Sequence, residues 1–265
     1  MPISPARWQP LLSTRQLGRP APHVAHTLTS TNTVLRELGR QGAPHGTVCL
    51  CECQTGGKGR LGRTWASPEG KGVWISVLLR PQLKMEDAPL ITLITAMAMA
   101  QAIRESCGVA AQVKWPNDLV YAGRKVCGVL AELGFDTDGG YHVITGAGLN
   151  VHEGAYPPEL AHRAAALAEF APAPDRSEVI ARYLQALETL LDTLEIEGFP
   201  GIESAYRALS CTLGSQVHVL GAAEDFTGVA ESVDATGALL VRTGNGELRR
   251  VLAGDVSVRG VMGYV

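Results

Sequence analysis

The chain has 265 residues, of which 46% are hydrophobic and 18% charged, and its formal net charge is -3. This length can bury one substantial core and leave a small second domain. The small net charge argues against wholesale binding of nucleic acid or membrane, so any anion site must be local. No apolar stretch reaches the ~20 residues of a membrane span. We therefore expect a soluble, cytoplasmic protein.

Cysteine usage argues against a disulfide-stabilised secreted protein. The six cysteines include no C-x-x-C pair, and Cys49, Cys51 and Cys53 alternate. On a strand, this spacing puts all three on one face as small buried apolar groups. A metal site would need histidines at ligand spacing, and none stand near this run. We predict a reducing environment and no structural disulfides.

The patterns in chain order predict an α+β domain after a short N-terminal segment. The first 29 residues contain no acidic residue and no continuous apolar segment, which argues against a secretory signal. We expect residues 1–27 to form a loose tail or an edge decoration. The following patterns predict a short helix, two strands and a long buried helix closed by a glycine, over residues 33–40, 47–53, 73–80 and 90–107.

Residues 112–149 are predicted to form antiparallel strands, because short turns separate their apolar runs. A helix follows Pro174, capped by Asp175 or Ser177 and carrying an apolar stripe that reaches Leu194. After Ser210, short β-type segments punctuated by glycine are typical of a small barrel. We therefore expect a main domain over residues 28–210 and a barrel domain over residues 211–265.

The run from Gly56 to Trp65 holds four glycines and three cations. Glycines expose backbone N–H groups, and guanidinium forks match a multiply charged anion such as a polyphosphate. The run lacks the Lys-Ser/Thr ending of the common ATPase phosphate loop. Taken alone, it is better explained as a flexible, solvated basic loop.

Three further stretches carry polar or small residues that structure alone could explain. Ser30-Thr31-Asn32 has the composition of a helix N-cap. Turn chemistry accounts for Pro116-Asn117-Asp118, although not for the Lys-Trp before it or for Lys125 after the next turn. Gly146–Asn150 is a strand whose small residues let a flat ligand approach the backbone. Their joint occurrence, with Gln54 beside the glycine-rich run, indicates a single binding site.

Together, these motifs resemble those of the biotin protein ligases. G-x-G-R-x-G-R-x-W, K-W-P-N-D, G-R-K-x-x-G and G-A-G-x-N all occur, and the resemblance runs from about Leu28 to the C-terminus. It implies an α+β catalytic domain with a mixed or antiparallel sheet and helices like those of class II aminoacyl-tRNA synthetases, then an SH3-like β-barrel. The implied activity forms biotinyl-5′-AMP from biotin and Mg²⁺-bound ATP. Biotin is then transferred to a lysine of a biotin carboxyl carrier protein domain.

The resemblance also implies roles for individual residues. On the biotin side it places Ser30, Thr31, Asn32 and Gln54. The biotin carboxylate and the ATP phosphates would be held by Arg60, Arg63 and Lys125, which together with Asp118 form the expected catalytic set. The pocket walls would be shaped by Gly57, Gly128, Gly146 and Gly148. The nucleotide side, with Mg²⁺, would be lined by Trp65, Lys114, Asn117, Asp118 and Asn150.

One position departs from the family pattern. Lys58 stands where family members usually carry arginine, which keeps the charge and loses the bidentate fork. We retain Lys58 as an expected biotin-side residue.

The residue types fit this chemistry independently of the resemblance. A carboxylate that attacks the α-phosphorus of ATP meets another anion, so fixed cations must offset the repulsion. In the second step, a lysine with a pKa of about 10.4 is mostly protonated at neutral pH. Asp118 is our candidate to assist it. The glycines further predict that residues 55–65 form a lid over biotinyl-AMP.

Three other functions are less consistent with the sequence. A lipoate protein ligase shares the catalytic fold, but lipoate has no ureido ring to pair with Ser30 and Gln54. A DNA-binding biotin repressor would need a helix-turn-helix module of ~60 residues, and only 29 Pro-rich residues precede Ser30. We therefore expect a monofunctional ligase without a nucleic-acid partner, and a homodimer stays open. A non-catalytic ligand-binding relic is disfavoured because the cations are all present.

Overall fold

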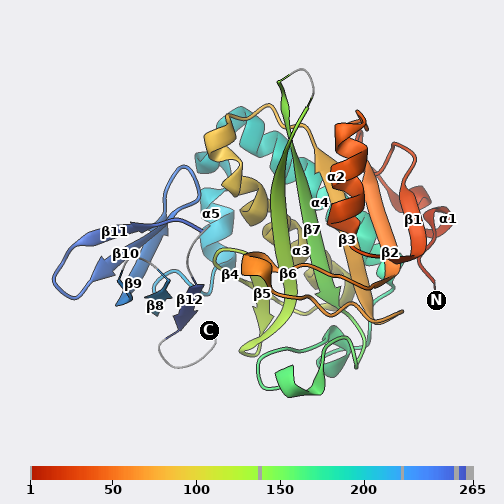
Figure 1. Cartoon of the computed structure of the whole chain (residues 1–265). Helices are drawn as coiled ribbons and strands as arrows, with labels where there is room; N and C mark the ends of the chain where they lie inside the picture. Colours follow the sequence, from red (N-terminus) through yellow and green to blue (C-terminus); the bar gives the residue numbers. More distant parts are fainter. Residues whose placement is uncertain (1, 137–138, 222–223, 254–256, 261–265) are drawn as a thin grey trace.

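The computed structural model describes residues 2–136, 139–221, 224–253 and 257–260 (Figure 1). Its main sheet has seven strands in the order β1-β2-β3-β7-β6-β5-β4. All pairings are antiparallel except that of β1 with β2, so the expected mixed sheet is confirmed. The strands are β1 His23–Leu28, β2 Val48–Gln54, β3 Gly72–Leu79, β4 Gln112–Lys114, β5 Asp118–Tyr121, β6 Arg124–Phe135 and β7 Tyr141–Asn150.

Helices cover both faces of this sheet. On one face, Leu35 of α2 (Thr31–Arg40) packs against Cys49, Leu78 and Ile144. On the other face, α3 (Pro89–Cys107) lies against the strands, and α4 (Arg176–Glu197) packs against α3. Because β3 is buried on both sides, its side chains divide between the two layers.

The predicted ends of two helices are confirmed. Gly108 follows α3 with a left-handed φ of 74°, a conformation that glycine adopts without strain. The side chain of Asp175 accepts a hydrogen bond from the Ser177 N–H at 2.8 Å and caps α4. Asp175, one of the two candidates, is therefore the cap.

The N-terminal segment packs against α4 rather than lying loose. It contains α1 (Pro5–Trp8) and the 3₁₀ helix η1 (Gln9–Leu11), and Trp8 is completely buried. The edge strand β1 follows and pairs with β2. The burial of Trp8 and Leu17 supplies the apolar contact that a free tail would lack.

The C-terminal part is a second sheet, reached through α5 (Phe199–Leu209), a helix that the patterns did not predict. Its strands are β8 Gln216–Leu220, β9 Phe226–Val233, β10 Leu239–Thr243, β11 Leu248–Val251 and β12 Ser257–Gly260. They pair antiparallel in the order β11-β10-β9-β8-β12. Within the described ranges β11 and β12 are the two edges, and no pairing among these residues closes the sheet into the expected barrel.

The remaining helical turns are short, and they belong to loops. They are η2 Arg60–Gly62, η3 Met85–Asp87, η4 Pro158–Leu160 and η5 Leu167–Glu169. All six cysteines are free thiols. Cys49 and Cys51 are buried as predicted, whereas Cys53 is only partly buried. Among the residues that the structure covers, no helix has both the length and the apolar character needed to cross a bilayer.

Candidate functional site

A pocket lies between the start of α2, the loop from Thr55 to Ala66, and strands β6 and β7. The space between its walls, including the part open to solvent, is about 460 Å³. The structure brings predicted residues from four separate stretches of sequence into its lining. They are Ser30, Thr31, Asn32, Gln54, Lys58, Arg60, Trp65, Asn117, Lys125, Gly128, Gly146 and Gly148.

Ser30 occupies the N-cap position of α2 without capping it through its side chain. Its backbone is extended, with φ of -161° and ψ of 136°, as at many caps, but its side chain makes no capping hydrogen bond. The residue is buried and lines the pocket. The capping role that the sequence suggested is therefore not what its hydroxyl does.

Thr31 and Gln54 are joined before any ligand binds. The Thr31 N–H donates to Gln54 Oε1 at 2.9 Å, and Gln54 Nε2 donates to Ser67 Oγ at 2.7 Å. Thr31 Oγ1 also lies 2.7 Å from the hydroxyl of Ser76. These contacts fix the orientation of the Gln54 amide, because its oxygen and its nitrogen each have a partner.

Asn32 braces the pocket wall with its amide. Its Nδ2 donates to the Leu130 carbonyl at 3.2 Å and to Glu132 Oε2 at 2.8 Å, and its Oδ1 accepts from Ser76 at 2.6 Å. The brace connects α2 to both β3 and β6. Asn32 therefore shapes the wall through the protein's own polar groups.

The glycines predicted to shape the pocket walls lie too close to other residues to carry a side chain. A Cβ on Gly146 would stand 2.2 Å from Asn32 Oδ1, and one on Gly148 would stand 2.4 Å from Trp65 Nε1. A Cβ on Gly128 would meet Lys125 Nζ at 2.9 Å, and one on Gly57 would meet the Trp65 carbonyl at 2.3 Å. A side chain at any of these positions would displace a pocket residue.

Three cations line the pocket, namely Lys58, Arg60 and Lys125. Arg60 donates from Nη1 to Asn117 Oδ1 at 3.0 Å and also contacts the Ala253 carbonyl of the C-terminal part. Burial lowers the pKa of Arg60, while the carboxylate of Asp118 acts to raise it. An arginine remains charged even so, because its ordinary pKa is above 12.

Lys125 lies where β6 begins and combines two contacts. Its Nζ forms an ion pair with Asp118 Oδ1 at 2.6 Å and stands 4.9 Å from the centre of the Trp65 ring. The Trp65 indole therefore covers the ammonium group on one side. Asp118 itself does not line the pocket but lies behind Lys125.

Several predicted residues lie outside the pocket lining. Arg63 is exposed on the loop, and Gly57 lies beneath Trp65. Lys114 is buried and donates from Nζ to the Val258 carbonyl at 3.1 Å, so it points toward the C-terminal sheet. Asn150 is buried and donates to the Ala165 carbonyl at 3.0 Å.

Ser67 and Ser76 were missed as site residues. Ser67 holds Gln54, and Ser76 joins Thr31 to Asn32. A signal for Ser76 was present, because it is the only polar residue in the otherwise apolar strand β3. A buried hydroxyl in such a strand needs a partner. Nothing comparable in the sequence distinguishes Ser67.

Comparisons with known proteins agree with this geometry. Residues 24–150 match the model of the biotin/lipoate A/B protein ligase family, and residues 212–259 match that of the biotin protein ligase C-terminal domain. A mixed sheet with a glycine-walled pocket lined by cations, in this arrangement of domains, defines the class of biotin and lipoate ligases.

Individual relatives indicate the biotin branch of this class. The chain is 33% identical over 234 residues to the bifunctional ligase/repressor BirA of Bacillus subtilis, covering 87% of this chain and 72% of that protein. It is 33% identical over 238 residues to the biotin–[acetyl-CoA-carboxylase] ligase of Mycobacterium tuberculosis, covering 86% and 85%. The biotin protein ligase of Aquifex aeolicus in complex with biotin and ATP has a TM-score of 0.79 at 29% identity, covering 91% and 99%. The chain belongs to the biotin protein ligase family.

Proposed function

We propose that this protein makes biotinyl-5′-AMP from biotin and ATP and then transfers the biotin to a lysine of a biotin carboxyl carrier protein domain. The main support for the proposal is that one pocket holds both kinds of group. Its lining contains the polar side chains of Thr31 and Gln54 and the cations Arg60 and Lys125. An acid and a nucleotide can meet only where such cations offset their repulsion. The likeness to an Aquifex protein that holds biotin and ATP adds independent support.

We assign the polar wall to the ureido ring of biotin. Gln54 has an oriented amide, and Ser30 has a hydroxyl that does not cap its helix. Groups of this kind can recognise a ring that both donates and accepts hydrogen bonds. A lipoate ring offers neither function, so this wall does not favour lipoate as the substrate.

We assign the other side of the pocket to ATP. The indole Nε1 of Trp65 and the Oδ1 of Asn150 are buried and have no hydrogen-bond partner among the described residues. A buried polar atom without a partner is costly, and a purine supplies both donors and acceptors. On this assignment Trp65 packs against the adenylate and Asn150 reads the base. Arg60 and Lys125 hold the phosphates and the biotin carboxylate, Lys58 lies on the biotin side, and Arg63 joins them when the loop closes.

Mg²⁺ accompanies the ATP and neutralises charge on its phosphates. Across the described ranges, no three His, Cys, Asp or Glu side chains gather into a cage for a metal ion. This suits an ion that arrives on the phosphates and keeps most of its water ligands. We place Asp118 beside this region, together with Lys114 and Asn117.

The second step requires an acceptor lysine that loses a proton. Asp118 forms an ion pair with Lys125, which lines the pocket, and we assign Asp118 to assist the acceptor lysine. The loop over residues 55–65 closes on the adenylate and excludes water. We also propose that the C-terminal sheet, from about residue 211, is an SH3-like barrel that packs beside a catalytic domain over residues 28–210.

The test of the first step is biotin-dependent exchange of labelled pyrophosphate into ATP. We expect exchange with biotin and none with lipoate at equal concentration. Exchange with lipoate alone would contradict the proposal and favour the other branch of the class. The second step is tested by transfer of biotin to a purified carrier domain, measured as the increase in mass of that domain.

A further inference from the structure

The loop that carries Lys58, Arg60 and Trp65 leaves the sheet between β2 and β3. The last paired residues of these strands are Cys51 and Trp74. Beyond them the regular pairing ends, and individual hydrogen bonds cross between the two sides of the loop. The Gly70 N–H donates to the Glu52 carbonyl at 3.3 Å, and the Gln54 N–H donates to the Ser67 carbonyl at 3.1 Å. The ladder between β2 and β3 does not include Glu52 or Gly72.

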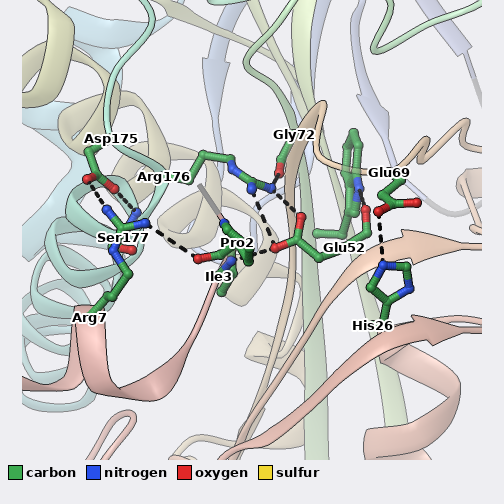
Figure 2. Close-up of polar contacts among 11 residues, drawn as sticks. Pro2, Ile3, Arg7, His26, Glu52, Glu69, Gly72, Asp175, Arg176 and Ser177 are labelled. Atoms are coloured by element: carbon green, nitrogen blue, oxygen red, sulfur yellow. Dashed lines mark hydrogen bonds and ion pairs between the residues drawn. The ribbon is translucent and has the colours of Figure 1, made fainter.

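A guanidinium group adds a direct link between Glu52 and Gly72. Arg176, the first residue of α4, donates from Nη1 to Glu52 Oε2 at 2.8 Å and to the Gly72 carbonyl at 3.1 Å (Figure 2). Its Nη2 lies 3.4 Å from Glu52 Oε1. Glu52 belongs to one stem of the loop and Gly72 to the other, so Arg176 links the two stems directly.

The link is deeply buried. Arg176 is 6% exposed and Glu52 is 8% exposed. Glu52 also accepts a hydrogen bond from the N–H of Ile3, in the N-terminal segment that crosses this region (Figure 2). Burying two charges costs desolvation energy that their attraction only partly returns, and apolar residues of similar volume often give equal stability. Stability alone is therefore a weak reason for an ion pair at this place.

The position of the link relative to the pocket suggests a different reason. Glu52 stands two residues before Gln54, whose amide holds Thr31 and Ser67. Ser67, on the returning side of the loop, pairs with Gln54 across the gap. The width of the stem therefore determines whether Gln54 can hold both partners and where the loop cations lie.

We propose that Arg176 is a positioning residue for the pocket, acting through Glu52 and Gly72 to set the width of the loop stem and thereby the placement of Gln54 and of the loop side chains. It touches no substrate. The inference rests on the proposed function only in naming biotin as the ligand whose binding it controls.

Two variants separate positioning from stability. Arg176→Lys keeps the charge but cannot bridge Glu52 and Gly72 with a planar fork. The double variant Glu52→Gln with Arg176→Met removes both buried charges and leaves an acceptor for Ile3, so it should fold even where a lone Arg176→Ala leaves an unpaired Glu52. Arg7→Ala is the matched control, because it removes the more exposed Arg7–Asp175 ion pair at the same end of α4 (Figure 2).

The kinetic measurement is pyrophosphate exchange at varied biotin, with melting curves for every variant. We expect the KM for biotin to rise by about 10- to 100-fold in both Arg176 variants, with kcat changed by less than about twofold because saturating ligand restores the loop. The Arg7→Ala control should keep the wild-type KM. A double variant with wild-type KM would overturn the proposal. So would a fall in kcat at unchanged KM, which is the result of losing folded enzyme.

The second measurement does not depend on the reaction. Limited proteolysis without ligand should cut the loop over residues 55–71 faster in both Arg176 variants than in the wild type and in Arg7→Ala. If the wild type showed no biotin-dependent exchange, the proposed function would fail while this measurement still decided the positioning role. Equal cutting in all four proteins would overturn that role.

Discussion

The polar wall of the pocket and the loop opposite it are built in different ways. On the wall, Thr31 and Asn32 are buried and already bonded to neighbouring side chains. On the loop, Arg63 is exposed, and Leu61 is 54% exposed with a left-handed φ of 56°, which is unusual for leucine. We propose that the wall is preorganised for recognition and that the loop rearranges when an anion binds. The difference predicts that substitutions in the loop act on the reaction, whereas substitutions in the wall act on binding.

The largest effect is expected on the loop side, at Arg60. Arg60→Ala removes the cation held by Asn117, and we expect adenylate formation to slow by about 10²–10³-fold. Single-turnover formation of biotinyl-AMP measures it. Arg63→Ala is the companion variant, and we expect a smaller loss because Arg63 is exposed and lies outside the pocket lining. If adenylate formation slowed equally in both variants, the expected difference between Arg60 and Arg63 would be wrong.

A second effect separates the two chemical steps. Asp118→Asn removes the acidic partner of Lys125, and we expect transfer to the carrier lysine to slow by about 100-fold. Adenylate formation should fall much less. Preformed biotinyl-AMP, mixed with carrier domain and enzyme, isolates the transfer step. If Asp118→Asn transferred biotin at the wild-type rate while adenylate formation was intact, Asp118 would have no role in the transfer step.

The wall is tested by adding one methyl group. The Cβ of Gly146→Ala would stand 2.2 Å from Asn32 Oδ1, so Asn32 must shift and weaken its contact with Ser76. We expect a stability loss of about 1–3 kcal/mol and a KM for biotin raised by about tenfold, with kcat nearly unchanged. Gly244→Ala is the control, since a Cβ there meets nothing within 4 Å. An unchanged KM would mean that the wall is not rigid.

The smallest effect is expected at Glu188, a residue of α4 that binds the N-terminal segment. Burial acts to raise the pKa of Glu188, but the N–H groups of Arg15, Leu17 and Gln16 outweigh it, so the folded pKa is lowered. The resulting stability is present above the unfolded pKa of about 4.3 and is lost as the pH falls through the lowered folded value.

Urea unfolding of the wild type and Glu188→Gln measures this contribution. We expect the wild type to be more stable by about 1–3 kcal/mol at neutral pH, with the difference shrinking in acid. The KM for biotin should not change. A stability difference that is independent of pH would contradict the assignment of the effect to the carboxylate.

Much of the fold could be predicted because its signals are local. The helices α2, α3 and α4 and the strands from β2 to β7 follow from apolar periodicity, turn residues and caps. The strand β1 and the helix α5 were missed, because β1 is partly exposed along its length and α5 carries only a short apolar face. Closure of the C-terminal sheet depends on pairing between distant strands, which no local pattern specifies.

The candidate site was predicted as a set of residues but not as a geometry. Motif spacing brought Ser30, Gln54, Arg60 and Lys125 together, and the pocket contains all four. The pattern could not show that Lys114 points toward the C-terminal sheet or that Ser76 joins Thr31 to Asn32. Such contacts join residues far apart in the chain, so they appear only after the sheet has formed.

By itself, the sequence determined which chemical groups this protein can offer a ligand, because glycines, cations and amides keep their chemistry wherever they lie. Tertiary structure decided which of them face one pocket, which brace it and which lie outside. It alone showed that Arg176, more than 100 residues from the loop, joins the two stems of that loop. The physical reason is that a hydrogen bond requires atoms about 3 Å apart, and only the folded chain sets such distances between remote residues.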